Sequence, residues 1–157
     1  LVLVSVEVAL ALKPAAIVCL AFLVISGIGP GLFSFSGMIS RGIPAMITLI
    51  TGILAGAALA PALLPQLPGT MFSVKGISTG LGLSIPTALV LAHHTGFYGV
   101  VGLILTATAL SSYLAMNFTG TSPYTSPTGV EKEMRRFIPI QAGAFIVGTL
   151  LWIVSAF

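Results

Sequence analysis

The segment Asn117-Phe-Thr-Gly-Thr-Ser-Pro-Tyr-Thr-Ser-Pro-Thr-Gly-Val-Glu-Lys-Glu-Met-Arg-Arg136 is a polar stretch in a chain that is otherwise almost entirely apolar. It holds five of the nine charged residues, which comprise six Lys or Arg and three Asp or Glu. It is also rich in Ser, Thr, Gly and Pro. Such a segment between long apolar runs predicts a loop and helix start outside a membrane.

The composition indicates an integral membrane protein. The chain is 57% hydrophobic and 6% charged, whereas a soluble domain carries about 25% charged residues. The net charge of +3 is too small to indicate a nucleic-acid partner. The single cysteine, Cys19, excludes an internal disulfide and a clustered-cysteine metal site within this chain.

A transmembrane helix needs about 20 mainly apolar residues, and five stretches of the chain meet this requirement. The sequence therefore predicts an all-α bundle of five transmembrane helices. The expected spans run from Leu10 to Ile28, Ile43 to Leu64, Val74 to Ala92, Gly96 to Phe118 and Ile138 to Ala156.

The residues before the first span have a different pattern. Leu1 to Val8 places β-branched residues in near-alternation, which is typical of a strand. We interpret residues 1–11 as the tail of a preceding soluble domain and residues 12–157 as the transmembrane domain. The alternative is that Leu1 to Val8 extends the first helix.

The basic residues predict the orientation of the bundle. If the N-terminus is cytoplasmic, Lys13, Lys75 and the three basic residues of the polar segment lie on the cytoplasmic side, and Arg41 lies outside. Positive residues are enriched in cytoplasmic loops. We therefore expect residues 117–136 to be cytoplasmic, in an inner membrane.

Small residues in the spans favour close helix packing. Gly52 and Gly56 form one G-x-x-x-G motif, and Gly76 and Gly80 form another. This spacing lets helix backbones approach closely in lipid. Pro44 suits the first turn of the second span, where its missing N–H costs nothing.

The polar segment also contains a helix-start pattern. Thr128-Gly-Val-Glu131 fits a capping box and predicts that the last helix begins near Gly129. Its basic residues suit either lipid headgroups or a docked soluble domain. The two Ser-Pro steps predict ordered turns, which would suit binding of an anion or a domain.

Two other features suggest chemistry only weakly. His93 and His94 are adjacent, so on a helix they point about 100° apart and rarely ligate one metal; we expect an interfacial pair. Cys19 lies in the middle of the first span, where a buried structural thiol is expected.

The segment from Asn117 to Arg136, followed by Phe-Ile-Pro-Ile-Gln141, resembles the C-terminal membrane domain of the mercury-methylating corrinoid protein family. That family is related to the corrinoid subunit of the acetyl-CoA synthase/decarbonylase system. The resemblance implies a cytoplasmic cobalamin-binding domain followed by a five-helix membrane domain.

The resemblance also implies an activity for the full-length protein. A methyl group passes from the corrinoid cobalt to inorganic Hg(II), and a ferredoxin-like iron–sulfur partner reduces the cobalt. The family's functional cysteine lies in a soluble-domain motif of the form Asn-Val-Trp-Cys-Ala, which is absent here. No catalytic, cofactor-binding or metal-binding residue is therefore assigned to this chain.

The resemblance implies that this chain is a membrane anchor and that its polar segment faces the corrinoid domain. The polar side chains of this segment are the predicted contacts with that domain or a partner. They are Asn117, Thr119, Thr121, Tyr124, Thr125, Thr128, Glu131, Glu133, Arg135 and Arg136. The alternatives are a stand-alone small transporter or conduit, and a relative of the family with another activity.

Overall fold

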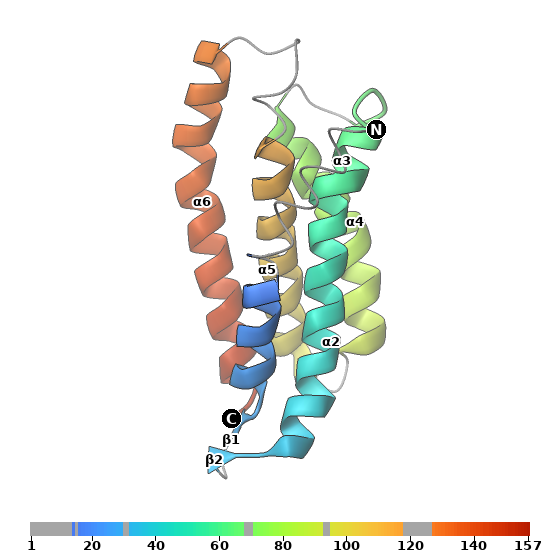
Figure 1. The fold of residues 1–157 in the computed structure, drawn as a ribbon, viewed down its shortest axis with the longest axis vertical. Helices are drawn as coiled ribbons and strands as arrows, with labels where there is room; N and C mark the ends of the chain where they lie inside the picture. The colour runs from blue at the N-terminus through green and yellow to red at the C-terminus, as the bar shows by residue number, and fades with distance from the viewer. Residues whose placement is uncertain (1–13, 15, 30–31, 68–70, 93–94, 118–126) are drawn as a thin grey trace.

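A computed structural model describes residue 14 and residues 16–29, 32–67, 71–92, 95–117 and 127–157. These residues form a helical bundle with one small hairpin (Figure 1). The elements are a helix Ala16–Ser26, strands β1 Ile28–Gly29 and β2 Leu32–Phe33, helix α2 Phe35–Leu54, a π-helical segment η1 Ala55–Leu59, and helices α3 Ala60–Ala62, α4 Phe72–Leu91, α5 Gly96–Asn117 and α6 Pro127–Val154.

Four helical segments in the described part of the chain are long and apolar enough to cross a membrane. They are Phe35–Ala62, Phe72–Leu91, Gly96–Asn117 and Glu131–Val154. This confirms the helical bundle and four of the five expected spans. The long helices run side by side, with α5 among the others (Figure 1).

The first expected span differs from the structure. Its described helix, Ala16–Ser26, ends two residues before the expected end, and residues 10–13 and 15 of the expected span lie outside the described residues. Ile28, the expected end of the span, instead pairs with Phe33 in the antiparallel β1–β2 hairpin. The strand expected over residues 1–8 lies outside the described residues.

The second span begins eight residues earlier than expected. Helix α2 starts at Phe35, where the N-cap Ser34 accepts a hydrogen bond from Gly37 N at 3.2 Å. Pro44 therefore lies inside the helix, and its predicted place in the first turn is wrong. The helix includes Arg41, whose side chain bonds to Trp152 of α6 and to Ser155 just beyond it, contacts that the sequence does not show.

A π-helical turn interrupts this span near its end. In η1 the N–H of Ala60 bonds to Ala55 O, one residue further back than in an α-helix. Pro61 follows immediately, and its ring would clash with the carbonyl four residues earlier in a regular α-helix. The wider π-helical turn thus lies directly before Pro61, where the hydrogen bonding of a regular α-helix would bring the clash.

Helix α5 is the centre of the bundle, and glycines set its distance from α2 and α4. A Cβ atom on Gly52 would lie 2.6 Å from Ala107 O, and one on Gly76 would lie 2.7 Å from Ser112 Cα. Gly56 and Gly80 both pack against Ser111. The two G-x-x-x-G motifs thus make close backbone contacts, as predicted.

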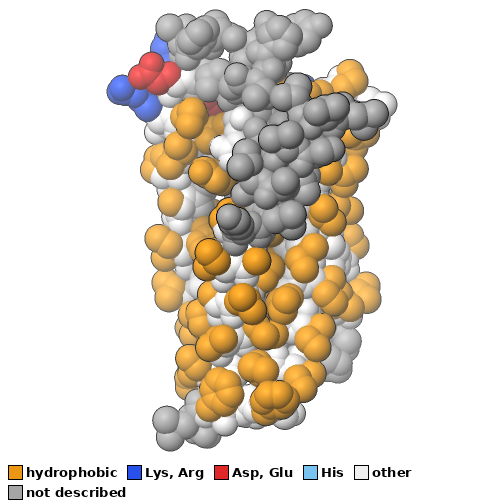
Figure 2. Space-filling model, viewed as in Figure 1, with side chains coloured by type: hydrophobic (Ala, Val, Ile, Leu, Met, Phe, Trp, Pro, Cys, Tyr) orange, Lys and Arg blue, Asp and Glu red, His pale blue; other side chains and the backbone are white. Residues whose placement is uncertain are grey.

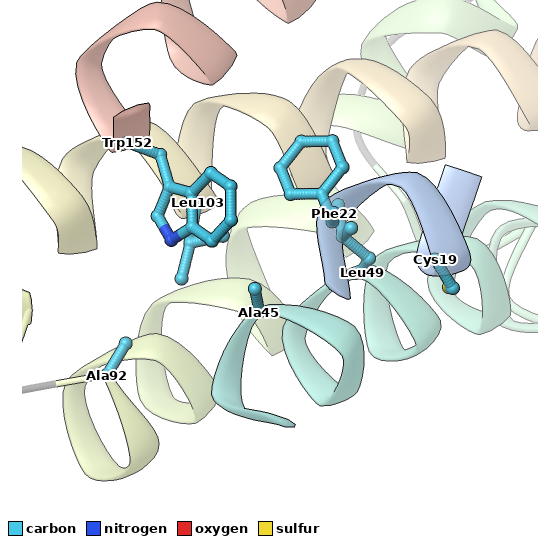
Figure 3. Close-up of a cluster of buried hydrophobic side chains, with 7 residues drawn as sticks. All are labelled: Cys19, Phe22, Ala45, Leu49, Ala92, Leu103 and Trp152. Carbon is cyan, nitrogen blue, oxygen red and sulfur yellow. The ribbon is translucent and has the colours of Figure 1, made fainter. Parts of the chain in front are cut away.

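A cluster of buried side chains joins the short first helix to α2, α5 and α6 (Figure 3). Phe22 packs against Trp152, with ring centroids 4.9 Å apart, and edge-on against Phe145 at 6.4 Å. Cys19 is buried in this cluster, which confirms the expected buried thiol.

Candidate functional site: the charged end of the bundle

The first turns of α6 carry an exposed group of charged side chains (Figure 2). Lys132, Arg135 and Arg136 are exposed, and Arg135 forms an ion pair with Glu131 at 2.9 Å. Both partners of this pair are largely in solvent, so it adds little stability. Apolar side chains cover much of the described surface below them in this view (Figure 2).

Glu133 has a different environment from its charged neighbours. Its Oε1 accepts hydrogen bonds from Ser73 N at 2.7 Å and from Ser73 Oγ at 2.5 Å. The N-cap residue of α4, Met71, provides no side-chain cap, and the first turn of α4 contains no acidic residue. Glu133 thus caps the start of α4 from α6, where a carboxylate also interacts favourably with the helix dipole.

Lys75 joins the same end of the bundle. Its Nζ donates to Leu64 O at 2.7 Å, which satisfies a carbonyl just beyond the end of α3. Lys75 and the three basic residues of α6 lie at the end where α4 and α6 begin, whereas Arg41 contacts the end of α6. The described basic residues therefore divide between the two ends as the sequence predicts.

A chain of hydrogen bonds leads from this end into the bundle. Ser112 Oγ of α5 donates to Ser73 O at 3.0 Å, and Gln141 Nε2 of α6 donates to Ser112 Oγ at 2.8 Å. With the bonds from Ser73 to Glu133, this chain connects α4, α5 and α6. Each link joins two helices, so the chain holds α6 at a defined height on α5.

Two grooves flank the contact between α5 and α6. One, of about 350 Å³, lies between α4 and α6 over α5, and its walls include Ile77, Leu81, Thr108, Ser112, Ile140 and Gln141. The other, of about 330 Å³, is lined by Leu110, Tyr113, Ile138, Gln141, Phe145 and Ile146, among others. Gln141 lines both grooves.

At the opposite end of the bundle, Arg41 bonds α2 to the end of α6. Its guanidinium donates to Trp152 O at 2.7 Å and to Ser155 Oγ at 2.9 Å, and lies 5.3 Å from the Trp152 ring centroid. A positive charge near the last carbonyls of a helix is stabilising. We infer a structural role that sequence reasoning did not assign to Arg41.

Four of the predicted contact residues are exposed at the charged end: Asn117, Glu131, Arg135 and Arg136. Glu133 is half-buried and bonded to Ser73. Helix α6 begins at Pro127, two residues before the start that the sequence predicts near Gly129, and the side chain of Thr128 lies outside the described part of the structure. Thr119, Thr121, Tyr124 and Thr125, and also His93 and His94, lie outside the described residues.

Sequence reasoning missed three residues of this site: Ser73, Ser112 and Gln141. Gln141 carries a recognisable signal, because it is an amide in a long apolar run and polar side chains in such runs usually bond across helices. Ser73 and Ser112 carry no comparable signal, since Ser is common in membrane helices and bonds its own backbone there.

Comparisons with known proteins add no assignment. No protein-family model matches the chain, and neither a curated protein nor a solved structure was found to be similar to it. Within the described ranges, no group of three or more His, Cys, Asp or Glu side chains is placed to hold a metal ion.

Proposed function

We propose that this chain is the membrane domain of a corrinoid-dependent methyltransferase that methylates inorganic mercury, and that its charged end docks the cytoplasmic corrinoid domain. The observation that carries the docking role is the exposed, basic start of α6, with Lys132, Arg135 and Arg136 in solvent. The resemblance of residues 117–136 to the family supports the activity.

In this proposal the chain holds the soluble domain in place and takes no part in the methyl transfer itself. The corrinoid in the soluble domain supplies the methyl group and a ferredoxin-like iron–sulfur protein reduces the cobalt. A domain held at the membrane surface meets its docking site at a high effective concentration. The ion pairs and hydrogen bonds of the start of α6 then set the orientation of the docked domain.

The internal bonds of the charged end support this assignment. Glu133 bonds the start of α6 to Ser73 of α4, and Lys75 bonds the start of α4 to Leu64 just beyond α3, so the beginning of α6 is held against a braced α4. The side chains of Lys132, Arg135 and Arg136 remain exposed above this brace. A braced helix start presents its outer side chains in a fixed geometry, which lowers the entropy lost on docking.

The first test is the coding sequence upstream of Leu1. An in-frame corrinoid domain with a cap-helix cysteine beside a tryptophan supports the proposal. A start codon directly before Leu1 contradicts it.

The functional test uses the full-length protein in membranes. We expect Arg135→Ala together with Arg136→Ala to lower methylmercury formation roughly five- to thirtyfold, since the pair supplies two charged contacts of about 1–2 kcal/mol in total. The double Lys variant keeps both charges and should retain most activity. Equal membrane levels of the three proteins are the control, and full activity of the double Ala variant contradicts the docking role.

A second candidate function is a small transporter or conduit. The observation that favours it is a set of buried hydroxyl groups between α4 and α5, including the Ser84 and Thr108 oxygens 3.3 Å apart. Hg(II) uptake into proteoliposomes containing this chain alone distinguishes the two. Uptake lost in Ser84→Ala supports a conduit, and no uptake leaves the docking role.

A further inference from the structure

Charged side chains near the start of α6 form two pairs at i,i+4 spacing, and only one of the pairs is neutral. Glu131 and Arg135 form an ion pair at 2.9 Å. Lys132 and Arg136 have the same spacing but carry the same charge, and both are exposed. Like charges at this spacing repel each other on a helix, so an anion bound between these two cations would be favoured.

Neither of the described acidic residues neutralises this pair of cations. Glu131 is already paired with Arg135, and Glu133 accepts hydrogen bonds from the N–H and the hydroxyl group of Ser73. The remaining acidic residue of the chain, Glu7, lies outside the described residues. Within the described part of the chain, the two cations therefore have no counter-ion.

The two cations lie above an exposed apolar face of α6, which we call the outer stripe. Its exposed positions, together with the two cations, lie within about 60° of one another around the helix axis and are Lys132, Arg136, Gly143, Val147 and Leu150. Val147 and Leu150 are 50% and 55% exposed, and a Cβ atom on Gly143 would meet nothing within 4 Å. In a membrane, an uncovered apolar face of a spanning helix contacts lipid chains. The two cations therefore stand at the head of a lipid-facing stripe.

The depth of the two cations selects the source of the anion. The apolar span of α6 begins at Glu131, so Lys132 and Arg136 lie at its boundary, where long basic side chains reach the headgroup layer. A phospholipid brings a phosphate to that depth and an acyl chain to the outer stripe below it, whereas a soluble anion leaves the stripe uncovered. A lipid with a net negative charge is favoured over a zwitterionic lipid, because the ammonium group of the latter competes with the two cations for the phosphate.

We propose that the outer stripe of α6 binds an anionic phospholipid, whose phosphate lies between Lys132 and Arg136 and whose acyl chain passes Gly143 and Val147. The site goes beyond the docking role, because it lies on the side of the bundle and needs no corrinoid domain. Arg136 also belongs to the proposed docking residues, and its guanidinium has enough N–H donors to contact a headgroup and a docked domain together.

The test is photolabelling of the protein in phosphatidylcholine nanodiscs. The two probes are phosphatidylglycerol and phosphatidylcholine, each with the same diazirine in its acyl chain. We expect the phosphatidylglycerol probe to label the α6 peptide that contains Gly143 and Val147 about thirtyfold more than the phosphatidylcholine probe, a ratio that corresponds to about 2 kcal/mol for two cations near a membrane surface. Equal labelling of this peptide by the two probes overturns the proposal. An equal preference for phosphatidylglycerol on α2 peptides also overturns it, because general attraction to the protein would then explain the ratio.

Two double variants locate the effect. Lys132→Gln together with Arg136→Gln should bring the ratio to about one, because it removes both charges, and it should fold because both side chains are exposed. The matched control is Glu131→Gln together with Arg135→Gln, which removes the neighbouring pair without changing the net charge and should keep the ratio within about twofold. An unchanged ratio in the first variant, or the same loss in the control, overturns the site. Labelling is measured without the corrinoid domain, so it separates a failure of the lipid site from a failure of docking.

Discussion

At the residue scale, side chains of similar type have different roles in the charged segment. Glu131 and Glu133 are two positions apart, yet Glu131 pairs with Arg135 in solvent and Glu133 caps α4. With 3.6 residues per turn, residues two positions apart point about 200° away from each other, so one carboxylate is outward and the other inward. The half-buried position of Glu133 follows from the packing of α6 against α5, which brings Glu133 to the start of α4.

This difference predicts unequal costs of removing the two carboxylates. Glu133→Ala leaves the buried Ser73 donors without a partner, so we expect a loss of about 1–3 kcal/mol in the free energy of unfolding. Glu131→Ala removes an exposed ion pair and should cost under about 0.5 kcal/mol. Unfolding in mixed detergent micelles measures both, and equal losses would show that Glu133 does not cap α4.

At the element scale, α5 is the helix on which the others are assembled. Gly76 and Gly80 of α4, Gly52 of α2 and Gly56 of η1 contact it through their backbones. Without a hydrophobic driving force between helices in lipid, such close contacts and interhelical hydrogen bonds hold a bundle together. Ser111 Oγ, which donates to Gly76 O at 2.8 Å, adds a bond at the same contact.

The glycines of α4 offer a matched pair for testing this packing. A Cβ on Gly76 would lie 2.7 Å from Ala115 Cβ, whereas a Cβ on Gly82 meets nothing within 4 Å. We expect Gly76→Val to destabilise the bundle by about 2 kcal/mol through overpacking. Gly82→Val should change stability by no more than about 0.5 kcal/mol. Detergent unfolding of the two variants is the measurement, and similar values would argue against close packing of α4 on α5.

At the scale of the whole molecule, the charges mark two ends of one bundle. Arg136 stands near the start of α6, and Arg41 bonds to Trp152 O near its end. The sixteen residues from Arg136 to Trp152 correspond to about 24 Å of helix, somewhat less than the hydrocarbon core of about 30 Å. The separation suits a single crossing of α6 between its two charged ends.

This geometry predicts which side of the membrane each end faces. In a Cys19→Ala background, Arg136→Cys should react with an impermeant maleimide only from the cytoplasmic side, because basic residues favour that side. Phe157→Cys, an exposed position past the end of α6, should react only from the opposite side. Labelling of right-side-out and inverted vesicles measures both, and reaction of the two positions from one side contradicts a single crossing by α6.

The sequence by itself determined that the chain is a bundle of apolar helices and that most of its charges gather at one end. It also determined where α4 and α5 lie, to within two residues, whereas α2 and α6 begin well before their expected spans. These properties depend on local composition and on runs of about 20 apolar residues, which are readable without knowing any contact. The docking function rests on the resemblance of one segment and stays a prediction.

The tertiary structure alone decided the rest. It started α2 at Phe35, which places Arg41 within the helix and in contact with the end of α6, and it turned Glu133 inward to Ser73. It also joined Ser112 to Gln141 and buried the amide oxygen of Gln141 without a hydrogen-bond partner among the described residues. These features depend on contacts between helices that are far apart in the sequence. A polar residue within an apolar run can be recognised from the sequence, but its partner on another helix cannot.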